Sequence, residues 1–205
     1  MRTLRESLLD DFGSQAADLR KERIKEWLEK HNYYGTHGLK FNPDGTIDID
    51  DFVYKEKGNF PDFIQFNRCD ADFVCSNRNM TSLRGCPQYV GGTFDCSINK
   101  LKTLVGGPKE VGGNFHCYGN QLTSLEGSPK EVGGSFNCSI NKLTSLKGSP
   151  EKVGGNFYCY NNQLTSLRDG PKEVGGSFYC SGNYLSVNEI KWANKNIKCD
   201  KFNWK

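Results

Sequence analysis

A repeat of 21 residues is the feature that most constrains how this chain can fold. Phenylalanine recurs at that period, a cysteine follows each phenylalanine by two residues, and asparagine and leucine columns keep the same register. A unit of this length cannot enclose a core alone, so consecutive units must stack into a solenoid. The phenylalanine and cysteine columns are Phe73, Phe94, Phe115, Phe136, Phe157 and Phe178, and Cys75, Cys96, Cys117, Cys138, Cys159 and Cys180.

Each unit is expected to contain one short strand. In Phe115-His116-Cys117 the period of a strand places Phe115 and Cys117 on one side and His116 on the other. Stacked coils then bury each phenylalanine, which is worth about 2 kcal/mol per ring. A Gly-Gly pair before each strand supplies either a positive φ or room for close backbone approach. We therefore predict a mainly β fold with a helical N-terminal cap, a leucine-rich-repeat-type solenoid whose parallel sheet has six to eight short strands.

Two polar columns of the repeat are expected to be structural. Asn99, Asn120, Asn141, Asn162 and Asn183 follow the strands, where a buried amide can bond main-chain groups of its own and the next coil. The 9 cysteines are odd in number and no two are separated by only two residues, which indicates reduced thiols packed as small hydrophobes. We expect no metal and no cofactor.

The chain divides into four expected segments. These are a helical segment at 1–38, a hairpin with a degenerate capping coil at 39–72, five to six coils at 73–185, and a C-terminal cap at 186–205. Gly13-Ser14 is expected to separate two helices, the first opened by a capping box of Thr3 with Glu6 and striped by Leu4, Leu8 and Phe12. The hairpin should turn at Pro43-Asp44-Gly45, and Ile197-Lys198-Cys199 should form the closing strand.

Composition and motifs exclude several classes of protein. A net charge of +3 is small for a nucleic-acid-binding protein, and no apolar run approaches the roughly 20 residues of a membrane span. The charged N-terminus is unlike a secretory signal, so we expect an intracellular protein. His116 and Cys117 would point to opposite faces of a strand and form no catalytic pair. Lys40 occupies the first ligand position of a calcium loop aligned on Gly45, which argues against calcium. We predict no enzyme and no catalytic residue.

The outward strand positions are the candidate binding site. Tyrosine gathers there in the C-terminal coils, and its large, rigid side chain suits protein interfaces. A structural alternative is that aromatic residues are favoured in strands in general. Another is that the alternation of tyrosine with other residues from coil to coil follows duplication of a 42-residue pair of coils. The predicted partner-binding residues are His116, Tyr118, Asn137, Tyr158, Tyr160, Tyr179 and Tyr184.

The repeat also resembles known proteins. The Asn-Gln-Leu-Thr-Ser-Leu of residues 120–125 and 162–167 is similar to the short leucine-rich repeats of bacterial effectors. The fuller unit, Pro-Lys-Glu-Val-Gly-Gly followed by Phe-x-Cys, and residues 1–9 and 42–50 resemble repeat proteins encoded by tailed bacteriophages. The resemblance covers residues 42–185. It implies a binding scaffold that acts in the cytoplasm of a host bacterial cell or is associated with the virion.

Three hypotheses of function follow. The leading one is a non-enzymatic protein-binding module that engages a host or phage protein of unknown identity through the concave sheet face, without a membrane partner. The alternative is a virion-associated or assembly protein docked through the N-terminal helix. A nucleic-acid partner, suggested by the C-terminal lysines beside Trp192 and Trp204, ranks last. The oligomeric state is left open, as is whether residues 1–31 dock on the solenoid.

Overall fold

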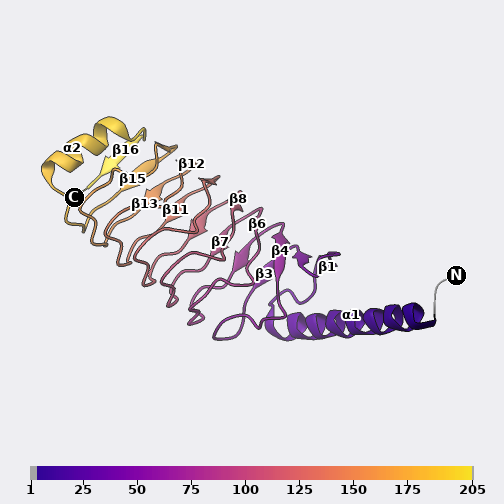
Figure 1. Cartoon of the computed structure of the whole chain (residues 1–205). Helices are drawn as coiled ribbons and strands as arrows, with labels where there is room; N and C mark the ends of the chain where they lie inside the picture. Colours follow the sequence, from indigo (N-terminus) through magenta and orange to yellow (C-terminus); the bar gives the residue numbers. More distant parts are fainter. Residues whose placement is uncertain (1–3, 205) are drawn as a thin grey trace.

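The repeats stack along one axis into a β-solenoid in the computed structural model, which describes residues 4–204 (Figure 1). Except for one antiparallel hairpin, neighbouring strands in the sheets are parallel, and each coil passes through two short strands on opposite sides of the core. The helix α1 (Leu4–His31) lies at one end of the stack and α2 (Val187–Asn196) at the other. The predicted mainly β solenoid with an N-terminal helix is confirmed.

The first sheet carries the phenylalanine column. Its strands pair in register, so that Phe52 lies beside Phe73 at one end and Phe178 beside Phe202 at the other. Successive rings lie with centroids 4.6 to 5.9 Å apart, and each side chain from Phe52 to Phe178 is buried. The eight strands are β3 (Phe52–Val53), β5 (Phe73–Val74), β7 (Phe94–Asp95), β9 (Phe115–His116), β11 (Phe136–Asn137), β13 (Phe157–Tyr158), β15 (Ser177–Tyr179) and β16 (Lys201–Asn203).

A second sheet, which the sequence did not predict, closes the other side of the core. Its later strands consist of two residues that end in a buried valine, such as Val111 or Val132. Each of these strands has a single buried residue followed by the Gly-Gly pair, so no second inward side chain reveals an alternation. The strands are β1 (Lys40–Phe41), β2 (Ile47–Ile49), β4 (Phe66–Cys69), β6 (Tyr89–Val90), β8 (Glu110–Val111), β10 (Glu131–Val132), β12 (Lys152–Val153) and β14 (Glu173–Val174).

The Gly-Gly pairs lie between the two sheets, where successive coils come closest. A Cβ added to Gly133 would overlap the carbonyl oxygen of Gly112 in the preceding coil, and φ of Gly133 is not positive. Of the two expected reasons for these glycines, close backbone approach therefore applies to the first glycine of the pair.

The asparagine column joins adjacent coils, as expected, but in the opposite direction along the chain. The Nδ2 of Asn120 donates to the carbonyl oxygens of Cys117 in its own coil (3.1 Å) and Cys96 in the preceding coil (3.0 Å). Its Oδ1 accepts from the backbone N–H of Leu101 at 3.0 Å. The amide thus satisfies groups of its own and the preceding coil rather than the next one.

The N-terminal segment is one continuous helix, so the prediction of two helices was wrong. Gly13 and Ser14 lie inside α1, where a glycine costs only about 1 kcal/mol relative to alanine and does not remove a hydrogen bond. The capping box of Thr3 with Glu6 and the stripe of Leu4, Leu8 and Phe12 lie outside the part of the chain whose side chains are described.

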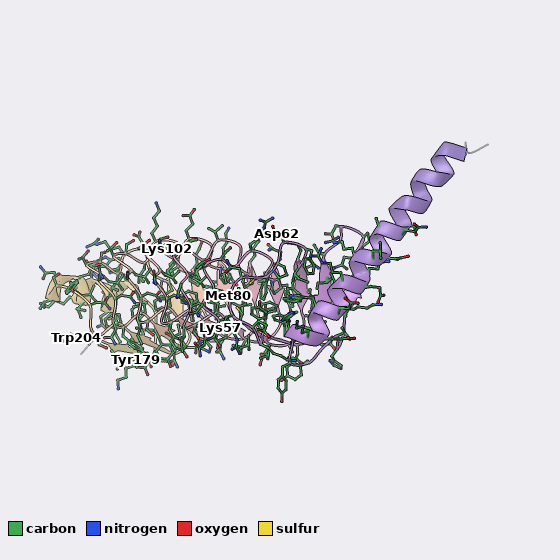
Figure 2. The ribbon with its side chains drawn as sticks, turned by 90° about the horizontal axis from the view of Figure 1, so that it is seen from below. Lys57, Asp62, Met80, Lys102, Tyr179 and Trp204 are labelled. Atoms are coloured by element: carbon green, nitrogen blue, oxygen red, sulfur yellow. The ribbon has the colours of Figure 1, made fainter. Side chains whose placement is uncertain are left out.

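The C-terminal part of α1 docks on the solenoid. Ile24 and Leu28 are buried, and the ring of Trp27 lies 6.3 Å from that of Phe52. Every residue from 13 to 23 is exposed, and Figures 1 and 2 show the helix projecting past the end of the coils. Residues 24–31 therefore cap the first coil. The preceding turn still contacts the solenoid, because Arg20 donates to the carbonyl of Gly45 and Arg23 lies over the ring of Phe63, whereas the N-terminal turns project from it.

The segment between α1 and the regular coils forms as expected. β1 and β2 pair antiparallel as a hairpin around Pro43-Asp44-Gly45. β3 pairs with β5 in the register of the repeat, which confirms residues 52–54 as a degenerate first coil. Asn32, just after α1, fixes this coil because its Oδ1 accepts from the N–H of Val53 at 2.8 Å and its Nδ2 donates to the carbonyl of Asp51 at 3.2 Å.

The C-terminal cap differs from the prediction in its closing strand. Ser186 caps α2 by accepting from the N–H of Glu189 at 3.2 Å, as expected for this helix start. The strand that completes the first sheet is β16, in which Phe202 stacks on Phe178 at 5.1 Å. Lys198, predicted to lie in that strand, bridges to Glu173 in the second sheet instead. The sequence suggested that Cys199 is equivalent to the cysteines of the repeat, whereas Phe202 makes the contact with Phe178 that continues the phenylalanine column.

Candidate protein-binding surface

Four of the predicted residues form one column on the outer side of the first sheet. His116, Asn137, Tyr158 and Tyr179 occupy register-paired positions of β9, β11, β13 and β15. Each follows a buried phenylalanine, so strand alternation directs its side chain away from the core. All four are half-buried, because neighbours in the column cover part of each side chain.

The two tyrosines of this column hold each other in place. The rings of Tyr158 and Tyr179 stack with centroids 4.8 Å apart and an interplanar angle of 10°. The Nδ2 of Asn156 also donates to the hydroxyl oxygen of Tyr158 at 2.9 Å. An ordered aromatic pair loses little conformational entropy when a partner binds.

A second column runs beside the first. Tyr118 and Tyr160 follow their strands, two residues beyond His116 and Tyr158, and each ring meets that neighbour edge-on with centroids 6.4 Å apart. We call the six residues of the two columns the tyrosine face. It consists of His116, Tyr118, Asn137, Tyr158, Tyr160 and Tyr179.

Tyr184, the seventh predicted residue, lies apart from the strands. It follows Asn183 on the turn after the sheet and is 73% exposed. The same position in earlier coils is held by Lys100, Gln121, Lys142 and Gln163, which are polar surface residues. The sequence grouped Tyr184 with the others by its proximity in the chain, whereas the strand register does not place it in either column. In Figure 2, the labelled Tyr179 lies toward the end of the solenoid opposite α1.

Two serines at positions equivalent to Tyr118 in neighbouring coils do not lie on this surface. Ser97 and Ser139 are buried. Their hydroxyls donate to the side-chain oxygens of Asp95 (2.6 Å) and Asn137 (2.5 Å), which folds the serines beneath those residues.

Two isoleucines beside the tyrosine face were not predicted. Ile98 and Ile140 have φ of 54° and 55°, a left-handed conformation that is unusual for a β-branched residue and costs about 1–2 kcal/mol. Both side chains are 49% exposed, so their burial does not compensate for this conformation. The signal was present in the sequence, because the same column holds asparagine or glycine in the other four coils (Asn77, Gly119, Asn161 and Gly182).

The cysteine column lies inside the core. Cys117 is fully buried while His116 is on the outer side, so the two do not face each other. Burial raises the pKa of Cys69 to about 12 and that of Cys180 to about 12. Burial also raises the pKa of Cys117 well above its ordinary value. Such thiols are protonated at neutral pH and are poor nucleophiles and metal ligands.

The acidic hairpin has internal partners for two of its carboxylates. The Oδ1 of Asp44 accepts from the N–H and the hydroxyl of Thr46, which lowers the pKa of Asp44. The Oδ1 of Asp48 accepts from Asn42 and Asn67, both at 2.8 Å. Among the side chains of residues 13–204, no group of three or more His, Cys, Asp or Glu is arranged to hold a metal ion.

At the C-terminal end, the charged residues make local pairs. The Nζ of Lys198 lies 3.0 Å from a carboxylate oxygen of Glu173, and the guanidinium of Arg168 lies 4.8 Å from the ring centroid of Trp192. Lys205 lies outside the described residues. No helix in the described part of the chain has the length and apolar character needed to cross a membrane.

Comparison with known proteins adds no family to this description. No family model, no curated protein and no solved structure matches the chain.

Proposed function

We propose that this protein is a non-enzymatic binding module that engages another protein through the tyrosine face. The observation that carries the proposal is the stacked pair of Tyr158 and Tyr179, held on a rigid sheet and partly open to solvent. Tyrosine is enriched among the residues that dominate binding energy at interfaces, and a preordered ring binds at a low entropic cost. The core of the solenoid does not require these side chains, since the phenylalanine column already fills the interior.

The proposed setting rests on the resemblance of the repeat to bacteriophage proteins. In that setting the module acts in the cytoplasm of an infected bacterium, on a host or phage protein. Its partner is a protein rather than a membrane or a nucleic acid, because the tyrosine face carries aromatic and amide groups and none of the lysine or arginine that phosphate recognition uses.

A paired affinity capture from bacterial lysate tests the proposal. The wild type is compared with Tyr158→Ala/Tyr160→Ala/Tyr179→Ala and with a matched control, Tyr33→Ala/Tyr34→Ala, which removes exposed tyrosines at the other end of the chain. Melting curves first establish that each variant is folded. We expect a protein that the wild type and the control retain and the triple variant loses. Equal recovery by all three would refute the tyrosine face as the site.

One observation favours a second candidate, a virion-associated or assembly protein. The N-terminal turns of α1 project from the solenoid, and residues 13–19 are exposed. Most of the stability of a helix in a protein comes from packing of one of its faces, so a helix that projects from its domain can gain stability by packing on a partner. Mass spectrometry of purified phage virions tests this candidate, and absence of the protein from the virions would exclude it.

A further inference from the structure

We propose that a groove on the outer side of the second sheet binds an uncharged glycan, with a sugar ring stacked on Tyr89. The groove is formed by three consecutive coils, at β6, β8 and β10. Its volume is about 740 Å³, and ligand sites usually have about 300–1,000 Å³. The second sheet lies across the core from the first, so this site is separate from the tyrosine face and does not rest on the function proposed above.

The floor and one wall of the groove are apolar. Val111 and Pro129 are buried and form the floor, and Gly112 has no side chain to fill the space above it. Tyr89 of β6 is half-buried and forms the wall. The guanidinium of Arg68, from the preceding coil, lies over this ring 3.9 Å from its centroid. Because Arg68 covers the ring from the side of the preceding coil, the other face is directed toward the following coils, where the groove lies.

Four charged side chains form the rim of the groove. Among the side chains of residues 13–204, Lys109, Glu110 and Lys130 have no ion-pair partner, whereas Glu131 pairs with Lys152 at 3.9 Å. Unpaired charged groups can form charge-assisted hydrogen bonds with the hydroxyls of a ligand. The charges of the two lysines and two glutamates on the rim cancel, which favours an uncharged polar ligand over an ion.

The equivalent space further along the same sheet is smaller. Between β10, β12 and β14 it has about 390 Å³ and is lined by Glu131, Lys152 and Glu173. The ion pair of Lys152 with Glu131 joins two of these lining residues. Tyr89 and Glu110 are register neighbours in the same column and form no such pair within residues 13–204, so the groove between their coils remains open.

A sugar ring matches this combination of groups. One face of a pyranose ring consists largely of C–H groups and can pack on an aromatic ring, and its hydroxyls lie around the edge. Tyr89 supplies the aromatic face. Glu110 can accept hydrogen bonds from the hydroxyls, and Lys109 and Lys130 can donate to them. The groove is open to solvent, so further sugars of an oligomer can extend beyond it.

A glycan array followed by titration tests the site. The array carries uncharged hexose oligomers, with carboxylate-bearing oligomers as the acidic comparison. Calorimetry with the best-retained oligomer then compares the full-length wild type with Tyr89→Ala, Tyr89→Phe and Glu110→Gln. Tyr184→Ala, which removes an exposed tyrosine from another surface, is the matched control. We expect uncharged oligomers to bind, about tenfold more weakly to Tyr89→Ala and Glu110→Gln, and equally well to Tyr89→Phe and Tyr184→Ala.

Melting curves first establish that each variant is folded, and Glu110→Gln, a change at an exposed position, provides the comparison if Tyr89→Ala does not fold. An array that retains no uncharged oligomer, or unchanged affinity of both weakened variants, would overturn the site. A preference for acidic oligomers that weakens with added salt would overturn the uncharged ligand. Tyr158→Ala/Tyr160→Ala/Tyr179→Ala should bind the glycan as the wild type does. Loss of glycan binding in that variant would place the glycan on the tyrosine face and overturn the assignment to the second sheet.

Discussion

Tyr158 and Tyr179 are 21 residues apart in the chain, yet their rings stack 4.8 Å apart on adjacent strands of the first sheet. The repeat length produces this contact, because one coil advances the chain by one strand and returns it to the same register. A side chain on this surface therefore has its neighbours in the preceding and following coils. Any partner that binds here meets a row of side chains contributed by successive repeats.

The stacked pair should be energetically coupled. We expect a double-mutant cycle of Tyr158→Ala and Tyr179→Ala to give an interaction energy of about 0.5–1.5 kcal/mol, because each single change removes the same ring contact. Urea denaturation of the four proteins measures it. Strict additivity of the two changes would contradict the contact.

The phenylalanine column should dominate the stability of the fold. Phe136 is fully buried between Phe115 and Phe157, with ring centroids 5.2 and 5.5 Å away. We expect Phe136→Ala to lower the free energy of unfolding by about 3–5 kcal/mol. Phe202→Ala is the matched change at the half-buried end of the same column and should cost less. Chemical denaturation compares the two, and a larger effect at Phe202 would contradict the account.

The asparagine column should be sensitive to loss of its amides. Asn120→Ala leaves the N–H of Leu101 without its acceptor, whereas the carbonyls of Cys96 and Cys117 keep the amides of Asn99 and Asn141. We therefore expect a loss of about 1–3 kcal/mol in the free energy of unfolding. Gln163→Ala removes an exposed amide from the residue that follows Asn162 of the same column. It should change the free energy of unfolding by less than about 0.5 kcal/mol. Equal effects of the two substitutions on the urea midpoint would show that the buried amide is not structural.

The buried thiols predict how stability depends on pH. Burial raises the pKa of Cys69 and of Cys180 to about 12 in the folded chain, whereas an exposed thiol titrates near 8.5. A raised folded pKa gives stability that is complete below the unfolded pKa and is lost as the pH rises toward the folded one. The free energy of unfolding should therefore fall between about pH 8.5 and 12. Measurement of urea midpoints across this range tests it, and a rise in stability there would contradict thiol burial.

Much of the fold could be predicted because the repeat is long and its columns have simple physical meanings. Phe115 and Cys117 alternate with His116 as a strand requires, and this pattern alone indicated the direction of each side chain. The second sheet was missed because a strand such as Glu131–Val132 has one buried residue followed by Gly-Gly, without the second inward side chain that Cys117 supplies after Phe115. The closing strand was misplaced because Phe202 lies outside the 21-residue spacing.

The candidate surface was predictable only in part. The strand register grouped His116, Asn137, Tyr158 and Tyr179 from the spacing of the repeat. Ser97, at the position equivalent to Tyr118, is buried and hydrogen-bonded to Asp95, which no periodicity reveals. Sequence periodicity specifies strand faces well, but it does not describe the turns that follow them, where Ser97 lies.

Site-specific photocrosslinking in bacterial cells tests the central claim most directly. A benzophenone amino acid replaces Tyr179 on the tyrosine face or Tyr33 near the end of α1, and the protein is irradiated in the cell. Binding through the tyrosine face predicts a discrete crosslinked protein from position 179 and none from position 33. A crosslink from position 33 alone, or none from position 179 while the affinity capture still recovers a partner, would contradict the claim.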